Sequence, residues 1–259
     1  MRHKVNKYTK LLYLFIVLAF MYLPIIFLAI ASFDESKLGT GKGFTLKWYA
    51  ELFSRSDVMD ALWVTVSIAV FATAISTIVG TAAAIGFYSM KRRTSSAMTV
   101  INNFPMMNPD IVTGISLMLL FAFMGIRRGY ATLLLAHLVF CIPYVVLAVL
   151  PKLKTMNPHL YEAALDMGAT PSKALLKVVI PQIRPGIITG ALLAFTMSLD
   201  DFAVSFFTGG TYNTLSTYIY SCVKTGIEPY LNALSVLMFL VILILMIFIN
   251  KRADLTELY

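Results

Sequence analysis

Residues 157–181, with the sequence NPHLYEAALDMGATPSKALLKVVIP, decide the fold that this chain is expected to adopt. The pair Asn157-Pro158 supplies a good N-cap followed by a residue that suits the first position of a helix. Gly168 can take the left-handed conformation that ends a helix. The pair Thr170-Pro171 repeats the starting signal, and Pro181 is expected to stop the second helix. The stretch therefore predicts two short helices joined by a tight corner.

This hairpin is too polar for the hydrocarbon core of a bilayer. Its charged side chains, or those just after it, are Glu162, Asp166, Lys173, Lys177 and Arg184. Burying them in lipid would cost several kcal/mol. The first helix nevertheless has an apolar side with small residues, where another surface could approach closely. Two interpretations fit this pattern: a hairpin that contacts a soluble partner, and an amphipathic loop that rests on lipid headgroups.

The spacing of the hairpin resembles a known motif. It runs Glu-Ala-Ala, three residues, Gly, nine residues, an aliphatic residue, one residue, an aliphatic residue and Pro. The matching positions are Glu162, Ala163, Ala164, Gly168, Val178, Ile180 and Pro181. This pattern resembles the EAA loop of the binding-protein-dependent (MetI-like) permeases of ABC importers, with Val178 where Ile is common and Ile180 where Leu is common. The resemblance implies that residues 155–181 form a cytoplasmic coupling-helix loop, which sits in a cleft of a partner ATPase.

The composition indicates an integral membrane protein. Of 259 residues 59% are hydrophobic and only 13% are charged, and the mean hydropathy is +0.80. A net charge of +8 suggests nucleic acid at first sight, but the charges are bunched between apolar runs, so we expect no nucleic-acid partner. Cys141 and Cys222 form neither a metal-ligand cluster nor a disulfide framework. We find no phosphate-binding glycine loop, metal-ligand spacing or nucleophile set, and expect a non-catalytic chain without metal or bound cofactor.

The apolar runs predict an all-α membrane protein with about six transmembrane helices, forming a single permease domain over residues 1–259. The expected spans are 11–31, 61–89, 98–125, 131–150, 186–208 and 231–250, with the coupling loop between the fourth and the fifth. The third is expected to break near Pro105 and Pro109, and the fourth to end at Pro151. The first run also fits a signal peptide, but its length favours a retained helix.

The basic residues set the expected topology. With the N-terminus in the cytoplasm, fourteen of the 21 Lys and Arg residues fall on the cytoplasmic side. This asymmetry agrees with the positive-inside rule and places both termini in the cytoplasm. Arg127 and Arg128, on a short outer turn, are the exception.

Three acids lie in or at the edge of predicted spans: Asp110, Asp200 and Asp201. Asp200 is expected roughly 21 Å along its helix, past the membrane midplane toward the outside. An ionised acid there costs about 2.5–3.5 kcal/mol unless it meets water or a cation, so these acids are candidates for the substrate path. The alternatives are a pair at the outer water interface and, for Asp110, a helix cap. Phe202 beside them adds an aromatic face that attracts ammonium groups, whereas His137 is expected to donate a helix-packing hydrogen bond.

A narrower resemblance covers nearly the whole chain. Residues 44–53, 109–117, 136–151, 198–202, 206–210 and 218–221 resemble the PotC-type permeases of spermidine/putrescine importers. That family implies half of an import pore in the bacterial cytoplasmic (inner) membrane. It also implies a second, different permease chain, a pair of ATP-binding subunits that hold ATP-Mg, and an extracellular or periplasmic substrate-binding protein.

Other functions also fit parts of the sequence. A permease for another small solute shares much of the scaffold. A secondary transporter driven by an ion gradient would show charge relays and inverted repeats within its spans, and neither is visible. The chain lacks the nucleophile, base or metal ligands that a membrane enzyme would need. A passive scaffold would differ from an importer in having no ATPase partner.

Overall fold

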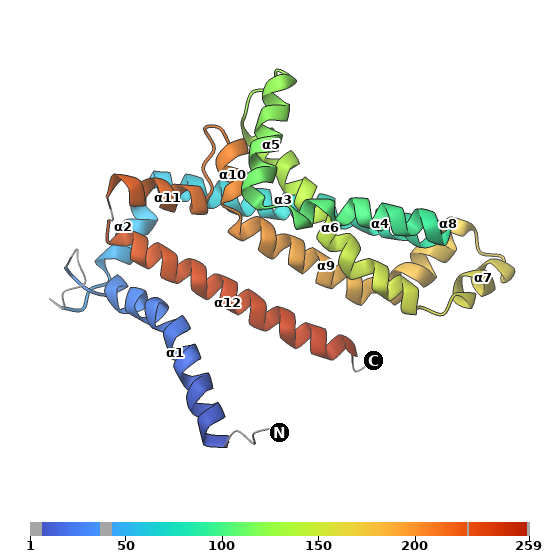
Figure 1. The fold of residues 1–259 in the computed structure, drawn as a ribbon, viewed down its shortest axis with the longest axis horizontal. Helices are drawn as coiled ribbons and strands as arrows, with labels where there is room; N and C mark the ends of the chain where they lie inside the picture. Colours follow the sequence, from blue (N-terminus) through green and yellow to red (C-terminus); the bar gives the residue numbers. More distant parts are fainter. Residues whose placement is uncertain (1–6, 37–42, 227, 258–259) are drawn as a thin grey trace, which may run out of the picture. The chain divides into compact units, whose positions relative to one another are not determined.

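The computed structural model describes residues 7–36, 43–226 and 228–257, and these form helices joined by short connections (Figure 1). No strand occurs in these ranges, so the expected all-α fold class is confirmed. The helices are α1 (Lys7–Ser32), α2 (Lys47–Ser54), α3 (Ser56–Ser89), α4 (Arg92–Met107), α5 (Asp110–Phe123), α6 (Tyr130–Thr155), α7 (His159–Asp166), α8 (Pro171–Ala174), the π-helical turn η1 (Leu175–Val179), α9 (Ile180–Asp200), α10 (Ala203–Thr208), α11 (Leu215–Thr225) and α12 (Tyr230–Glu257).

Four helices in the described ranges are long and apolar enough to cross a bilayer: Lys10–Ser32, Ser56–Ser89, Tyr130–Thr155 and Pro171–Asp200. There are five crossings if α4 and α5, which are bent by 100° relative to one another, count as one span. The apolar part of α12, Tyr230–Ile244, is shorter. The count of six spans therefore stays a prediction, and the basic residues Arg2 and Lys4 lie outside the described residues.

The chain divides into two compact units. The first comprises Met1–Met59 with Ile219–Leu245, and the second comprises Asp60–Tyr218 with Met246–Tyr259. In the first unit the indole Nε1 of Trp48 donates to the carbonyl of Asp34 at 2.7 Å. The ring of Phe33 stacks on that of Phe44. These contacts hold α2 against the end of α1.

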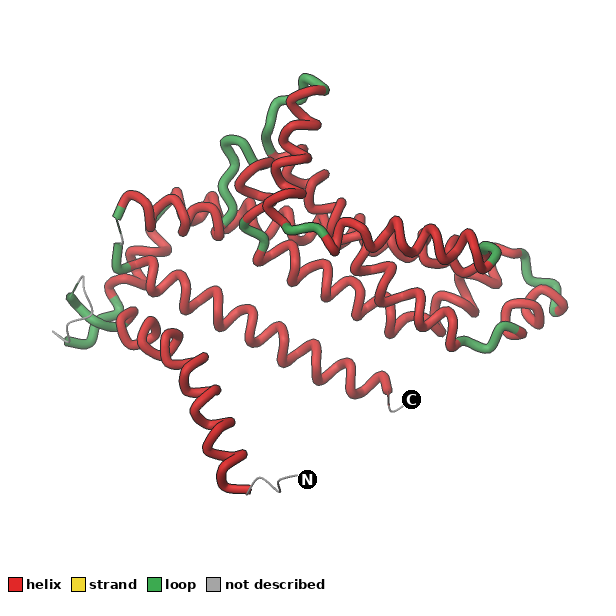
Figure 2. Tube along the Cα trace, in the orientation of Figure 1, coloured by secondary structure: helices red, strands yellow, loops and turns green. Residues whose placement is uncertain are grey.

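The second unit is built around α6 and α9, which lie side by side (Figure 2). Its buried core is formed mainly by aliphatic side chains of α6, joined by residues of α3, η1, α9 and α10. Glycines allow the helix backbones to come close. A Cβ on Gly190 of α9 would lie 3.0 Å from the Cα of Val145 in α6, and a Cβ on Gly80 of α3 would lie 2.7 Å from the Cβ of the same valine. Close approach through small residues is the usual way in which helices pack in lipid.

Two prolines do not end helices as expected. α6 runs four residues beyond Pro151 to Thr155, since prolines inside membrane helices are tolerated where neighbouring groups satisfy the freed carbonyl. Pro181 does not stop the second hairpin helix either, because it lies in the first turn of α9. The preceding turn is π-helical, and the N–H of Ile180 bonds the carbonyl of Leu175 five residues back. This wider turn accommodates a ring that would otherwise clash with the carbonyl four residues earlier.

The breaks in two other segments also differ in position from the expectation. The third apolar run separates into α4 and α5 at Asn108 and Pro109, while Pro105 lies inside α4. The run expected at 186–208 begins earlier, within the helix Pro171–Asp200, and is interrupted after Asp200. The short helix α10 follows that interruption and packs against α5 and α6. Both breaks line the same part of the second unit.

Candidate functional site

A cavity of about 530 Å³ lies where the α4–α5 and α9–α10 breaks meet α6. The carboxylates and aromatic rings in its wall are Asp110, Asp200, Asp201, Phe202, Phe140 and Tyr144. The four residues predicted to line a substrate path therefore lie around one cavity. Asp110 comes from the start of α5, and Asp200, Asp201 and Phe202 come from the break between α9 and α10. We call this space the acidic cavity.

Asp200 and Asp201 occupy different environments despite being neighbours. Asp200, the last residue of α9, is exposed. It makes no hydrogen bond or ion pair with any described residue. The side chain of Asp201 is only 7% exposed. Its Oδ1 accepts from the N–H of Val204 at 3.3 Å, and its Oδ2 accepts from the N–H of Ser205 at 2.7 Å. Asp201 therefore caps the first turn of α10, whereas Asp200 is open to the cavity.

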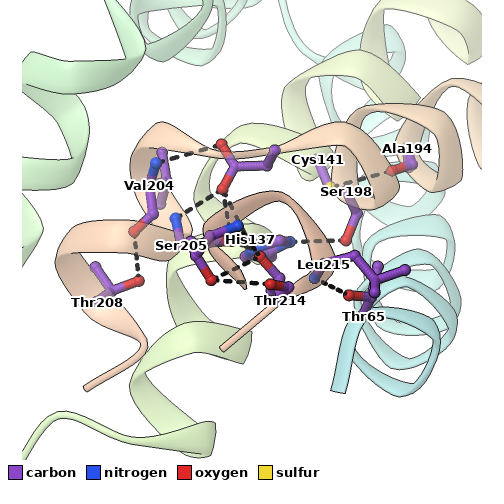
Figure 3. Close-up of polar contacts among 12 residues, drawn as sticks. Thr65, His137, Cys141, Ala194, Ser198, Val204, Ser205, Thr208, Thr214 and Leu215 are labelled. Carbon is purple, nitrogen blue, oxygen red and sulfur yellow. Dashed lines mark hydrogen bonds and ion pairs between the residues drawn. The ribbon is translucent and has the colours of Figure 1, made fainter. Parts of the chain in front are cut away.

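His137 lies behind Asp201, fully buried in the middle of α6. Its Nδ1 is 2.7 Å from the Oγ of Ser198 in α9, and its Nε2 is 3.0 Å from the Oγ of Ser205 in α10 (Figure 3). The same Nε2 lies 3.6 Å from Oδ2 of Asp201. The expected helix-packing role agrees with this geometry. The sequence does not indicate that Asp201 is a partner of His137, because the two residues belong to different segments of the chain.

Asp110 and the aromatic residues complete the wall. Asp110 is exposed and forms the first residue of α5, where the positive end of the helix dipole favours a negative charge. Phe202 packs against Phe206, with ring centroids 5.7 Å apart. Phe140 and Tyr144 were not singled out from the sequence. They lie one turn apart on α6, and in a chain with 18 Phe and 13 Tyr residues that spacing alone does not mark a site.

The hairpin forms at the far end of the second unit (Figure 1). α7 begins at His159 with Pro158 in the N-cap position, one residue later than expected, and the side-chain oxygen of Asn157 accepts from the N–H of His159 at 3.0 Å. Gly168 ends the helix with a φ of +82°. The N–H of Ala169 bonds the carbonyl of Ala164, and the N–H of Gly168 bonds that of Leu165. This pair of bonds is the Schellman arrangement, which satisfies the last carbonyls of a helix.

The seven motif residues divide between the two arms of the hairpin. Glu162, Ala163, Ala164 and Gly168 belong to α7 and its corner, and Val178, Ile180 and Pro181 belong to η1 and the start of α9. No residue of α7 is buried within the chain. The side chain of Met167 at the corner is 89% exposed. A second cavity, of about 520 Å³, separates α7 from the ends of α3 and α6, and Glu162 lies in its wall. The α7 face is thus open to a partner.

Comparison with known proteins identifies the family. Residues 76–254 match the family model described as the binding-protein-dependent transport system inner membrane component. The chain belongs to this family. The permease is also 40% identical over 237 residues to the spermidine/putrescine transport system permease protein PotC of Haemophilus influenzae. That alignment covers 91% of this chain and 92% of the relative. It is 37% identical to the putrescine transport system permease protein PotI of Escherichia coli strain K12, over 88% of this chain and 84% of the relative.

A solved structure shows the same fold. The permease aligns with a chain of a bacterial ABC transporter involved in the import of the acidic polysaccharide alginate, at a TM-score of 0.74 and 18% identity. The alignment covers 95% of the permease and 94% of that chain. The permease is therefore a multi-pass component of an inner-membrane transport system.

Proposed function

We propose that the permease forms half of the pore of an ATP-driven importer for polyamines such as spermidine or putrescine. The observation that carries this proposal is the acidic cavity. There Asp110 and Asp200, from separate helices, are open to one space with aromatic faces beside them. Separated carboxylates suit the separated ammonium groups of an oligoamine, and aromatic faces attract such groups. The 37–40% identity to PotC and PotI supports the same substrate class.

The partners follow from the same proposal. A pair of ATP-binding subunits holds ATP-Mg and contacts the α7 hairpin, so the permease itself binds no cofactor and catalyses no reaction. A second permease chain, different from this one, supplies the other half of the pore. An extracellular or periplasmic binding protein delivers the polyamine. Both termini of the permease lie in the cytoplasm, on the side of the hairpin.

Coupling between the hairpin and the cavity has a physical route. The helix that begins at Pro171, directly after the hairpin corner, continues through η1 and α9 to Asp200 in the cavity wall. Its 30 residues correspond to about 45 Å of helix. A displacement of the hairpin is therefore carried along one helix to the cavity. ATP drives transport only if the partner ATPase binds one position of this helix more tightly than the other.

The double change Asp110→Asn with Asp200→Asn tests the cavity. Each amide keeps the size of the side chain but removes its charge, and a hydrogen bond to a charged group is worth about 1.5–3 kcal/mol. We expect uptake of radiolabelled spermidine and putrescine into proteoliposomes, with the binding protein and the ATPase present, to fall at least about tenfold.

The control for this test is Asp60→Asn, which removes one exposed carboxylate of α3 outside the cavity and should leave uptake unchanged. The proposed function is contradicted if the wild type takes up no polyamine. It is also contradicted if uptake continues without ATP under an ion gradient. Normal uptake by the double variant removes the two acids from the substrate path.

A further inference from the structure

A buried polar cluster joins three helices next to the acidic cavity. His137 comes from α6, Ser198 from α9 and Ser205 from α10 (Figure 3). The residues are 0%, 2% and 2% exposed, respectively. Polar groups at such depth in a membrane protein are costly unless each has a partner. Here each side chain is hydrogen-bonded to another member of the cluster or to Asp201.

The directions of these hydrogen bonds follow from the donors that are present. An ionised Asp201 can only accept, so the hydroxyl of Ser205 donates to its Oδ2 at 2.8 Å. The Oγ of Ser205 then accepts from His137 Nε2–H. In the neutral imidazole Nδ1 is an acceptor, and the hydroxyl of Ser198 donates to it. The chain Ser198–His137–Ser205–Asp201 thus forms a relay in which every hydrogen is used, with the His137 proton on Nε2.

This relay orients Asp201 at the break between α9 and α10. Asp201 accepts from the N–H groups of Val204 and Ser205 and from the Ser205 hydroxyl, and the imidazole behind Ser205 fixes that hydroxyl. Because these bonds hold the side chain of Asp201 toward the buried cluster, the side chain of the preceding residue extends from the end of α9 in a different direction. That residue is Asp200, which is exposed in the cavity wall, whereas Asp201 borders the same cavity with a side chain that is only 7% exposed.

We propose that His137 is a positioning residue for transport, and that the two adjacent acids have separate roles. His137, Ser198 and Ser205 hold Asp201 as the cap of α10, and this arrangement directs Asp200 alone of the pair toward the substrate. Asp201 does not bind the cargo. This inference rests on the proposed import of polyamines through the acidic cavity.

Substitution of each acid by asparagine separates the two roles. Asparagine also serves as a helix cap but carries no charge. At position 201 its single oxygen can keep the two short bonds from the N–H and the hydroxyl of Ser205, and only the longer bond from the N–H of Val204, at 3.3 Å, is lost. The measured quantity is polyamine transported per ATP hydrolysed in proteoliposomes with a saturating amount of loaded binding protein. This ratio does not change when fewer complexes fold. We expect Asp200→Asn to lower it at least about tenfold and Asp201→Asn to leave it within about twofold of the wild type.

The role of His137 is tested in the same assay. His137→Leu replaces the imidazole by an apolar side chain and removes both of its hydrogen bonds, and we expect the ratio to fall about as far as in Asp200→Asn. His137→Gln, whose amide both donates and accepts, should restore part of it. The matched control is Thr65→Val, which removes another buried interhelical bond, from the N–H of Leu215 to Thr65 Oγ1 at 2.8 Å. The control should lower the amount of assembled complex without changing the ratio.

The outcomes distinguish this inference from the proposed function. Absence of polyamine transport by the wild type overturns the proposed function. With wild-type transport present, equal losses in Asp200→Asn and Asp201→Asn overturn the separation of roles. Should His137→Leu transport as much polyamine per ATP as the wild type, the positioning role is wrong. If that variant does not assemble, His137→Gln decides: a lowered ratio with normal assembly supports positioning, and an unchanged ratio contradicts it.

Discussion

Gly168→Pro is expected to abolish ATP-driven uptake while the permease still inserts into the membrane. Gly168 has a φ of +82°, and its N–H bonds the carbonyl of Leu165 at the end of α7. Proline fixes φ near −65° and has no N–H, so both features of the corner are lost. The change lies outside the packed core, since nothing lies within 4 Å of a Cβ built on Gly168. The expected defect is therefore in coupling to the ATPase rather than in folding of the spans.

A graded series at this position makes the prediction sharper. Alanine can adopt the left-handed conformation at a cost of about 1–2 kcal/mol, whereas asparagine adopts it more readily. Uptake should therefore fall in the order wild type, Gly168→Asn, Gly168→Ala, Gly168→Pro. Uptake rates and the amount of permease in the membrane are measured for each variant. If Gly168→Pro transports normally, or if Gly168→Asn is as defective as Gly168→Pro, the corner is not what couples the hairpin.

Gly190→Leu is expected to prevent assembly of the second unit. A Cβ on Gly190 would lie 3.0 Å from the Cα and 3.3 Å from the carbonyl oxygen of Val145, so the obstacle is the backbone of α6 and cannot rotate away. Overpacking in a well-packed core typically costs 1–3 kcal/mol, and a contact with the backbone is at the severe end of that range. Because α6 and α9 make the most extensive helix pair in the described chain, we expect little monodisperse permease after detergent extraction.

Gly86→Leu is the matched control for this prediction. Gly86 lies in α3, and nothing lies within 4 Å of a Cβ placed there. Leucine is also a better helix former than glycine by roughly 0.5–1 kcal/mol. The control should match or slightly exceed the wild type in yield and thermal midpoint. Equal yields of Gly190→Leu and Gly86→Leu would show that α6 and α9 do not approach each other as closely as described.

The hairpin corner could be predicted from the sequence because its signals are local. The hydrogen bond from the N–H of His159 to Asn157 and the left-handed Gly168 depend only on neighbouring groups, and both form, although the helix begins one residue later than expected. The effect of Pro181 could not be predicted in the same way. Whether a proline ends a helix depends on the carbonyl four residues earlier, and here the π-helical turn moves that carbonyl. The bend of 100° between α4 and α5 likewise exceeds what a proline signal specifies.

The acidic cavity was only partly predictable. The unfavourable placement of Asp110, Asp200 and Asp201 in apolar runs pointed to a polar space, and the structure places all three in one cavity wall. Asp200 and Asp201 are adjacent and therefore have almost the same neighbours along the chain, so the sequence does not show which of the two faces the cavity. That distinction depends on His137, which lies more than sixty residues away and meets Asp201 only in the folded chain.

The most direct test of the account is the sidedness and protection of position 167. Met167→Cys places a thiol at the exposed hairpin corner, in a background with Cys141→Ala and Cys222→Ser. In oriented vesicles we expect a membrane-impermeant thiol reagent to label this position from the cytoplasmic side only, and we expect the labelling to be lost when the ATPase subunits are bound. Labelling from the outer side, or labelling that the assembled ATPase leaves unchanged, would contradict the claim that this hairpin connects the permease to its ATPase.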